Sequence, residues 1–538
     1  MKDISSTGSF INFYLNNYIY VDKTQYIRDL IKLERVFISR PRRFGKSLTL
    51  DTIATLFETG VEPYFKGTWI YDKWTEPTYP VLRLNFLNLD NFSIDDFKNK
   101  LNSYITEFAN KIGVKEYAEK KEPEDSIDSM LEKLREEKRQ IVILIDEYDY
   151  QLTSNINNEE LYKQFQKELQ NIYNNLKDKW AIKFLLITGV TKTKNSSVFS
   201  GTDINDITNY SPYSQMIGFT RDEIKKYYID YLKLAASYEN NCSVDKVTDA
   251  QLESMLDMMA QNYDGYCFDE FYKKKVFSTW SVNKFFQNIV KNKFVDFGEY
   301  WYDNGGLPSI LANYLQTHKL NALDYIEKDK TINIKVNDYK NPTSLTSMNQ
   351  NVLMCQTGYL TLRSPVYSKG FMTLGIPNSE VYNALFSLMA LKVFDDTKLE
   401  NVNEQILAQS NDVGEIIGLF NTVLNTVSYD NYPINTEAMV QQLLYTYLKG
   451  ICNSVSAELH SSKGRADLVI ESDNRRIVFE FKYAKNETEA KSKLLDAVEQ
   501  IKTRDYGNIL PKKAELLRIA AVFNADPKVR AFTEYQQV

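Results

Sequence analysis

The N-terminal third of the chain alternates short apolar segments with longer amphipathic stretches. Apolar segments at 36–39, 80–86, 141–145 and 184–187 have the length of β-strands, and helical stretches lie between them. The run IVILI at 141–145 is apolar at every position, which is typical of a central strand buried on both faces. Strands that alternate with helices predict an α/β fold with a parallel, doubly wound sheet.

Near the C-terminus, the segment GRADLVIESDNRRIVFEFKYA contains two apolar strand patterns joined by a polar turn. If residues 473–474 form a two-residue turn, Ser472 pairs with Arg475. Counting outward from that pair places Asp467 directly opposite Glu480. The segment therefore predicts a hairpin with two opposed carboxylates, whereas an odd number of turn residues would move one of them to the other face.

The predicted hairpin gathers charged side chains on one of its faces. Alternation along a strand puts Lys482 on the same face as Glu480, while Phe479 and Phe481 point to the other face and into the core. Directly opposed carboxylates destabilise a sheet by roughly 0.2 to 1 kcal/mol, and a bound cation would reverse that effect. The pattern favours a divalent-metal site at Asp467 and Glu480, with a lysine beside it. An ordinary hairpin with a solvated charged side is the alternative.

The middle of the chain, from about 218 to 435, has mostly helical spacing. It begins with TRDEIKKYYIDYLKLAA, in which Thr220 and Glu223 form a capping box. A stretch rich in turn residues between Asp412 and Pro433 marks a boundary. We therefore expect an α/β domain at 1–218, a mostly helical lid and connector at 219–430, and a second α/β domain at 431–538.

Composition excludes several classes of protein. The 538 residues are too many for one core, and a formal net charge of -6 means that any contact with nucleic acid depends on local basic patches. Four cysteines without CxxC spacing and two histidines give poor support for zinc ribbons or zinc fingers. No N-terminal signal pattern and no apolar run near ~18 residues is present, which predicts a cytoplasmic protein without a membrane span.

A phosphate-binding loop is indicated at residues 40–47. The sequence RPRRFGKS follows the apolar segment at 36–39 and precedes an amphipathic helix. In such a loop, backbone N–H groups cradle phosphates, Lys46 reaches the β- and γ-phosphates, and Ser47 binds Mg²⁺. Arg40 stands where the motif has its first glycine, so the usual loop shape cannot be assumed. A surface turn before a helix is the alternative.

Acidic residues follow the buried run at 141–145. Asp146 and Glu147 stand at its carboxyl end, which lies beside the phosphate loop in such sheets. Asp146 would hold Mg²⁺ through water, and Glu147 would orient and deprotonate the attacking water. Thr188 follows the segment at 184–187 and places a polar side chain where a strand tip could sense the γ-phosphate. The alternatives are a helix N-cap with an acidic first turn for the acids and a structural role for the threonine.

Five segments resemble those of bacterial AAA-ATPase-like proteins: YVDKTQYI, FISRPRRFGKSLTLDTI, ILIDEYD, ITGVTKTKNSSVFSGTDINDIT and NYDGYCF. In that family RPRRFGKS is itself the signature, so Arg40 is a family trait. The family commonly ends in a domain of the PD-(D/E)XK nuclease superfamily, which GRADLVIE and FEFKYA resemble. The resemblance implies a P-loop site for ATP and Mg²⁺, with cofactor-binding residues Arg43, Phe44, Gly45, Lys46, Ser47, Leu48, Asp146 and Thr188.

In the nuclease-like domain, the resemblance makes Asp467 and Glu480 metal ligands. Lys482 becomes the residue that positions or polarises the attacking water. Gln500 matches a glutamine that some members of the superfamily carry on the helix after the catalytic strand. The implied catalytic residues are thus Asp467, Glu480, Lys482 and Gln500, together with Glu147 at the ATP site.

A glutamate on a helix that precedes the core is also usual in the superfamily. Glu437 and Glu458 are both candidates, and the sequence does not choose between them. Glu458 lies just before the Asp467 strand and could reach the metal from a neighbouring strand.

Together these features predict an ATP-binding protein with ATPase activity that controls a metal-dependent nuclease. Mg²⁺ is the expected metal, with Mn²⁺ as a substitute, and the resemblance favours DNA over RNA as the substrate. The alternative is a nucleotide-dependent switch or scaffold whose nuclease-like domain binds nucleic acid or a protein partner without cutting. ATPases of this general type often act as rings or dimers, and the sequence leaves a homo-oligomer open.

Overall fold

The computed structural model describes most of the chain. The described residues are 1–177, 179–193, 204–301, 310–311, 313–314, 318, 325, 329–367, 369–394, 405–427, 432–451, 455–461, 464–471, 474–508 and 513–538. The chain divides into two compact units, one of residues 1–319 with 328–381 and one of residues 320–327 with 382–538. The expected boundaries at 218 and 430 stay a prediction. None of the described helices is both long and apolar enough to cross a membrane.

The first unit is built on a five-stranded sheet with the order β2-β3-β4-β1-β5. All neighbouring strands run parallel, which confirms the predicted α/β class. Every residue of β3, which lies between β2 and β4, is buried, as its unbroken apolar run predicts. The strands are β1 (Arg35–Ser39), β2 (Val81–Asn85), β3 (Ile141–Asp146), β4 (Ile182–Gly189) and β5 (Asn205–Asp206).

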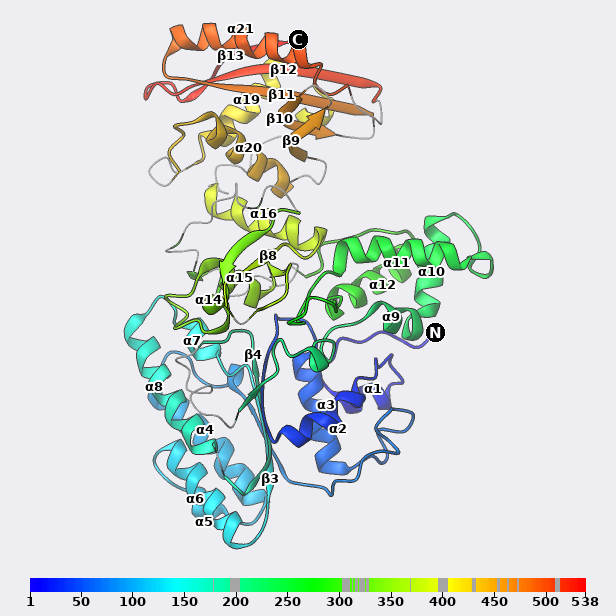
Figure 1. The fold of residues 1–538 in the computed structure, drawn as a ribbon, viewed down its shortest axis with the longest axis vertical. Helices are drawn as coiled ribbons and strands as arrows, with labels where there is room; N and C mark the ends of the chain where they lie inside the picture. The colour runs from blue at the N-terminus through cyan, green and yellow to red at the C-terminus, as the bar shows by residue number, and fades with distance from the viewer. Residues whose placement is uncertain are drawn as a thin grey trace. The chain divides into compact units, whose positions relative to one another are not determined.

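Strand pairing brings the carboxyl ends of β1, β3 and β4 to one edge of this sheet. Ser39 pairs with Gly189, and Asn85 pairs with Asp146. Ligands of open parallel sheets bind at this edge. Helices α1 to α3 lie on one side of the sheet, and α4, α5, α6 and α8 lie on the other (Figure 1). The helices are α1 (Phe10–Leu15), α2 (Ile27–Leu30), α3 (Lys46–Thr59), α4 (Ile94–Lys111), α5 (Lys115–Ala118), α6 (Pro123–Glu136), α7 (Tyr150–Ser154) and α8 (Glu159–Leu176).

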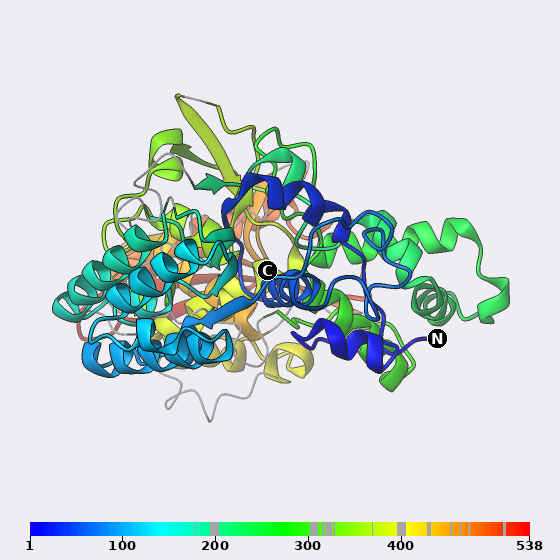
Figure 2. The same ribbon diagram turned by 90° about the horizontal axis from the view of Figure 1, so that it is seen from below.

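A group of helices lies between residues 220 and 292, and we refer to this group as the lid. Thr220 and Glu223 make the predicted capping box at the start of its first helix. The lid has its own apolar core, which includes Leu232, Met259 and Phe286. In Figure 2 the lid, coloured green, lies on the α3 side of the sheet, away from the cyan helices α4 to α8. Its helices are α9 (Arg221–Tyr227), α10 (Ile229–Glu239), α11 (Asp249–Tyr263) and α12 (Thr279–Asn292).

The rest of the middle region contains a small antiparallel sheet that the helical prediction lacked. Its order is β6-β8-β7, with β6 (Ile332–Lys335), β7 (Thr361–Leu362) and β8 (Phe371–Gly375). Strands this short leave no clear alternation in a sequence. Helices α14 (Val336–Lys340) and α15 (Gln350–Thr357) accompany this sheet, and α16 (Ser379–Val393) leads on from the first unit into the second.

The second unit contains a mixed sheet with the order β13-β12-β11-β10-β9. Strands β11 and β12 are parallel, and the other neighbours are antiparallel. Its strands are β9 (Val455–Ser461), β10 (Gly464–Glu471), β11 (Arg475–Ala484), β12 (Glu515–Asn524) and β13 (Ala531–Gln537). Its helices after α16 are α18 (Gln405–Gln409), α19 (Val413–Leu424), α20 (Glu437–Ile451) and α21 (Glu487–Arg504).

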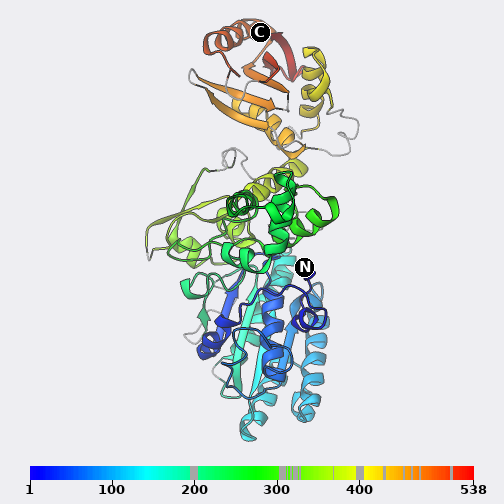
Figure 3. The same cartoon turned by 90° about the vertical axis from the view of Figure 1, so that its right-hand side faces the viewer.

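Helices cover both faces of this mixed sheet. Figure 3 shows α21 on one side, with α19 and α20 on the other. Val498 and Ile501 of α21 belong to one core cluster with Val478 of β11. On the opposite face the ring of Phe420 lies 5.1 Å from Phe479, and both Phe479 and Phe481 are fully buried. The expected core orientation of Phe479 and Phe481 is therefore confirmed.

Candidate functional site

A pocket of about 360 Å³ lies at the carboxyl edge of the parallel sheet. Residues 42–49, which end the 40–47 loop and begin α3, form one wall together with Glu147. Residues 5–8 of the N-terminal segment form another wall, and Lys23 lies nearby in the lining. The lid adds Thr279, Trp280 and Asn283 of α12. The predicted loop thus opens into a cavity closed by segments from three distant parts of the chain.

Lys46 and Ser47 lie at the start of α3, beside Asp146 and Glu147. Lys46 is buried, and its Nζ donates to the carbonyls of Arg40 at 3.1 Å and Pro41 at 3.2 Å. It lies 3.8 Å from Oε1 of Glu147. The hydroxyl of Ser47 donates to Oδ2 of Asp146 at 2.6 Å. A lysine, a hydroxyl and two carboxylates therefore converge at the start of α3.

The two acids of this site have different surroundings. Burial, followed by the charge of Glu147, raises the pKa of Asp146. The backbone N–H of Glu147 donates to Oδ1 of Asp146 at 3.0 Å, and Glu147 holds a positive φ of 52°. A left-handed backbone is uncommon for a residue with a side chain. Asp146 does not cap a helix, since Asp149 is the residue before α7.

Buried side chains, rather than glycines, hold the loop in shape. Arg40 donates to the carbonyls of Ser39 at 2.9 Å and Thr208 at 2.6 Å, and its guanidinium lies 4.2 Å from the ring centre of Phe268. Phe44 packs edge-on against the ring of Tyr266 at 4.7 Å. Gly45, with φ of 102°, supplies the left-handed turn into α3, and Arg43 also has a positive φ, of 67°. The buried contacts of Arg40 and Phe44 thus compensate for the departure from the usual P-loop.

Thr188 and Asp149 show where inference from the sequence was incomplete. Thr188 is fully buried, its hydroxyl has no hydrogen-bond partner among the described residues, and it is not among the described residues that line the pocket. Its proposed role at the γ-phosphate stays a prediction. Asp149, which the sequence did not single out, is buried and accepts from the backbone N–H of Thr191 at 2.7 Å. It fixes the chain that leaves β4.

The β10–β11 hairpin has the register that its sequence predicts. Leu468 pairs with Phe479 and Glu471 with Arg476, so the next position outward sets Asp467 against Glu480. Residues 472 and 473 lie outside the described residues, so only position 474 of the expected turn is described. Oδ2 of Asp467 accepts from the backbone N–H of Phe481 at 2.8 Å. The two predicted metal ligands therefore meet across one strand pair.

Lys482 joins these carboxylates as the alternation rule predicts. Its Nζ donates to Oε1 of Glu480 at 2.7 Å and to the carbonyl of Phe481 at 3.0 Å. It also lies 3.4 Å from Oε1 of Glu437, the first residue of α20. Burial opposes the charge on Lys482, but the hydrogen bond to Glu480 and the nearby acids outweigh it and raise its pKa.

Burial strongly shifts the pKa of Glu480. It is fully buried, and burial, followed by the charge of Asp467, raises its pKa to about 7. Its Oε2 has no hydrogen-bond partner among the described residues. A buried carboxylate oxygen without a partner costs free energy, whereas a divalent cation held by Asp467 and Glu480 would satisfy it. The residues present fit a metal site.

The remaining nuclease candidates differ in their placement. Position 458 lies opposite Asp467, because Ala466 pairs with Leu459 and Leu468 pairs with Ala457. The side chain of Glu458 lies outside the described residues. Glu437, the other candidate, reaches the cluster through Lys482.

Gln500 donates to the hydroxyl of Tyr506 at 3.1 Å. Among the described residues, no hydrogen bond joins Gln500 to Asp467 or Glu480. Its catalytic role stays a prediction.

Comparison with known proteins matches both of these regions. Residues 5–199 match the family model described as predicted AAA-ATPase, and residues 435–532 match that of the PD-(D/E)XK nuclease superfamily. This chain joins an AAA-ATPase-like domain to a PD-(D/E)XK nuclease superfamily domain. The described strands and helices of each unit fit these assignments.

One relative resembles the chain over nearly its whole length. It is described as an uncharacterised protein in the vnfD 5′ region of Azotobacter chroococcum mcd 1, and the two are 25% identical over 529 residues, which cover 95% of this chain and 94% of that protein. Among solved structures, Cdc6p from Pyrobaculum aerophilum is 12% identical and covers 69% of this chain and 92% of its own, with a TM-score of 0.22. The Orc1 protein of Aeropyrum pernix, solved in complex with DNA, is 12% identical and covers 71% of this chain and 97% of its own, with a TM-score of 0.26.

The raised pKa of Glu480 predicts how the metal-free protein responds to pH. Because the folded nuclease-superfamily domain holds this proton more tightly than an unfolded chain does, its stability falls as the pH rises from about 4.5 through about 7. We expect Glu480→Gln, which carries no such charge, to be more stable than wild type at pH 8.5 by up to about 3 kcal/mol, and little different at pH 5. Thermal unfolding in a chelator at the two pH values measures this, and equal stability at both would contradict it.

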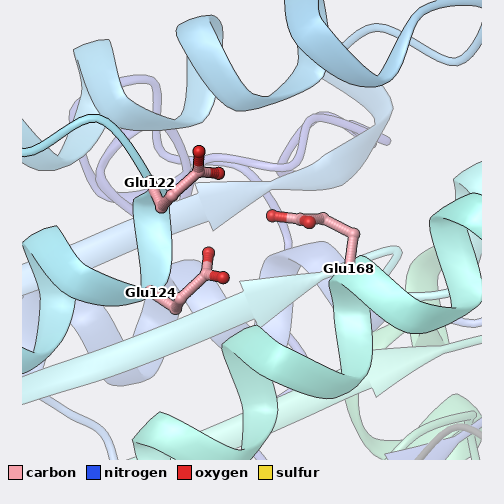
Figure 4. A group of neighbouring side chains, drawn as sticks. All are labelled: Glu122, Glu124 and Glu168. Carbon is pink, nitrogen blue, oxygen red and sulfur yellow. The ribbon is translucent and has the colours of Figure 1, made fainter.

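A separate acidic group lies within the AAA-ATPase-like domain. Figure 4 shows Glu122 and Glu124 at the start of α6 and Glu168 on α8, and one oxygen of each lies within 4.8 Å of the others. Nζ of Lys98 lies 2.7 Å from Oε2 of Glu122 and 3.0 Å from Oε2 of Glu168. The lysine already neutralises part of the group, so we assign it as an ion-pair network and place no metal there.

Proposed function

We propose that this protein is a nucleotide-controlled nuclease that hydrolyses phosphodiester bonds in DNA. The observation that carries the proposal is the cluster of Asp467, Glu480 and Lys482, in which a buried carboxylate oxygen lacks a partner among the described residues. Mg²⁺ or Mn²⁺ is the proposed metal, since carboxylate oxygens suit both ions. The intact ATP site supplies the proposed control.

In the proposed reaction, Asp467 and Glu480 hold the cation, and Glu437 or Glu458 completes its ligands. The chemistry that such a cation supplies when bound is activation of water and stabilisation of charge on the phosphate. Lys482 positions the attacking water, because its ammonium is fixed between Glu480 and the carbonyl of Phe481. The backbone N–H of Phe481 orients Asp467.

At the ATP site, Lys46 contacts the phosphates, and Ser47 with Asp146 holds Mg²⁺. Glu147, which lines the pocket, orients the water that attacks the γ-phosphate. P-loop ATPases generally use ATP, and PD-(D/E)XK nucleases generally use divalent metals. The residues of this chain fit both uses. ATP binding thereby acts in a domain separate from DNA cleavage.

A cleavage assay tests the proposal directly. The purified protein is incubated with plasmid DNA and with RNA of matched length, with Mg²⁺ or Mn²⁺ or a chelator, and with or without ATP. We expect metal-dependent cleavage of DNA that changes when ATP is added. Binding of DNA without cleavage under every condition would instead support the switch or scaffold.

A further inference from the structure

The phosphate loop is attached to two consecutive residues of the middle region. The guanidinium of Arg43 donates to the carbonyl of Tyr300 at 3.3 Å, and the indole N–H of Trp280 donates to the same carbonyl at 2.9 Å. Arg43 also lies 4.3 Å from the ring centre of Trp280. The indole N–H of Trp301 donates to the carbonyl of Arg42 at 3.5 Å. Residues 300 and 301 thus contact the loop where it faces the pocket.

Glu380 holds Trp301 of this pair through a hydrogen bond to its backbone. Its Oε1 accepts from the backbone N–H of Trp301 at 2.7 Å, and its Oε2 accepts from the hydroxyl of Ser281 at 2.7 Å. It is 2% exposed, and no cation pairs with it among the described residues. Burial raises the pKa of Glu380 to about 8. Both oxygens of this carboxylate are committed to linking α12, residue 301 and α16.

Glu380 lies at the start of the helix that leads from the first compact unit into the second. It is the second residue of α16, which begins in the first compact unit and whose residues from Tyr382 onward belong to the second. The start of α16 is further fixed by Asn378, which accepts from the N–H of Val381 at 3.0 Å and donates to the carbonyl of Asp264 at 2.7 Å. A continuous set of hydrogen bonds therefore runs from the phosphate loop to the helix that enters the nuclease-bearing unit.

We infer that Glu380 is a positioning residue for the nucleotide site: it fixes Tyr300 and Trp301 against Arg42 and Arg43, and it carries the state of the loop to the start of α16. The inference rests on the proposed function, because it requires the loop to bind ATP. A phosphate that attracts Arg43 competes with the carbonyl of Tyr300 for the same guanidinium. Coupling of this kind is reciprocal, so whatever holds residues 300 and 301 also sets the affinity of the loop.

The test compares nucleotide affinity in three variants, measured with a fluorescent ATP analogue and Mg²⁺. We expect Glu380→Ala to weaken binding at least about fivefold, because the loop loses its preorganisation. Glu380→Gln still accepts from the N–H of Trp301, and it should bind within about twofold of wild type. Val381→Ala is the matched control: it truncates a fully buried side chain of the same helix turn, and it should lower the melting temperature while affinity is kept.

A second readout follows Trp301 itself and distinguishes positioning from general stability. The sequence has five tryptophans, so fluorotryptophan labelling gives five ¹⁹F resonances, and Trp301→Phe identifies the one concerned. We expect that resonance to shift when ATP saturates wild type and Glu380→Gln. If Glu380→Ala fails to fold, the shift of the Trp301 resonance in wild type and Glu380→Gln still tests whether residue 301 responds to ATP.

The possible outcomes separate this inference from the proposed function. If wild type binds ATP but the Trp301 resonance stays in place and Glu380→Ala binds equally well, the inference is overturned and the proposed function stands. If wild type binds no nucleotide, both are overturned.

Discussion

Replacing Asp467 with asparagine is expected to lower metal-dependent DNA cleavage at least about a thousandfold, which corresponds to ~4 kcal/mol of transition-state stabilisation. Asparagine has nearly the same shape, and its carbonyl oxygen can still accept from the N–H of Phe481, so the hairpin should be kept. What is lost is one of two charges that hold the cation. Cleavage rates with Mg²⁺ and with Mn²⁺ measure the effect, and direct titration with Mn²⁺ should show weaker binding.

Asp496→Asn is the matched control for this substitution. It makes the same chemical change in the same unit, on an exposed side chain of α21 that lies near Lys493. We expect its cleavage rate to equal that of wild type. Cleavage that survives Asp467→Asn at the wild-type rate would show that the cluster is not the catalytic centre, whatever its geometry.

The hairpin register could be predicted because it depends only on local rules. A two-residue turn and the period of two along a strand fix which side chains are opposed, and no distant contact is needed to set Asp467 against Glu480. Four strands of the parallel sheet, β1 to β4, were accessible for a similar reason, since β3, for example, is apolar at every position before its final Asp146. The fifth strand, β5, has only two residues, Asn205 and Asp206, and was not predicted.

Features that depend on tertiary contacts were not accessible in this way. Nothing local distinguishes Glu437 from Glu458 as the additional acid, because the choice depends on where α20 meets the sheet. The segment at 5–8 has no motif, yet it lines the ATP pocket together with Trp280 of the lid. Glu380 carries no sequence signal at all, and its importance comes from burial against Trp301.

The phosphate loop combines both kinds of information. Its sequence identifies Lys46 and Ser47 at the start of a helix, but the single glycine would not by itself give the loop its shape. Arg40 and Phe44 supply that shape by packing into the core, which explains why an arginine replaces the first glycine of the usual motif. Because packing contacts hold the loop in place, a change in the conformation of the loop also changes those contacts.

Lys46→Ala is expected to weaken ATP binding at least about a hundredfold, or ~2.7 kcal/mol. Lys46 is 4% exposed, and it is the lysine that lies beside both the loop carbonyls and Glu147. Its removal leaves the β- and γ-phosphates beside two carboxylates without a compensating ammonium, so repulsion adds to the lost attraction. Calorimetric titration with ATP and Mg²⁺ gives the affinity, and a thermal melt checks the fold.

Glu147→Gln separates binding from hydrolysis at the same pocket. The amide keeps the size of the side chain and removes the base, so ATP should bind at least as tightly as in wild type, while phosphate release falls by about 10² to 10⁴. Lys32→Ala, at an exposed lysine of the same unit, should change neither quantity. If Lys46→Ala instead binds ATP with the affinity of wild type, ATP does not occupy this loop. Regulation of the nuclease would then require a different ligand.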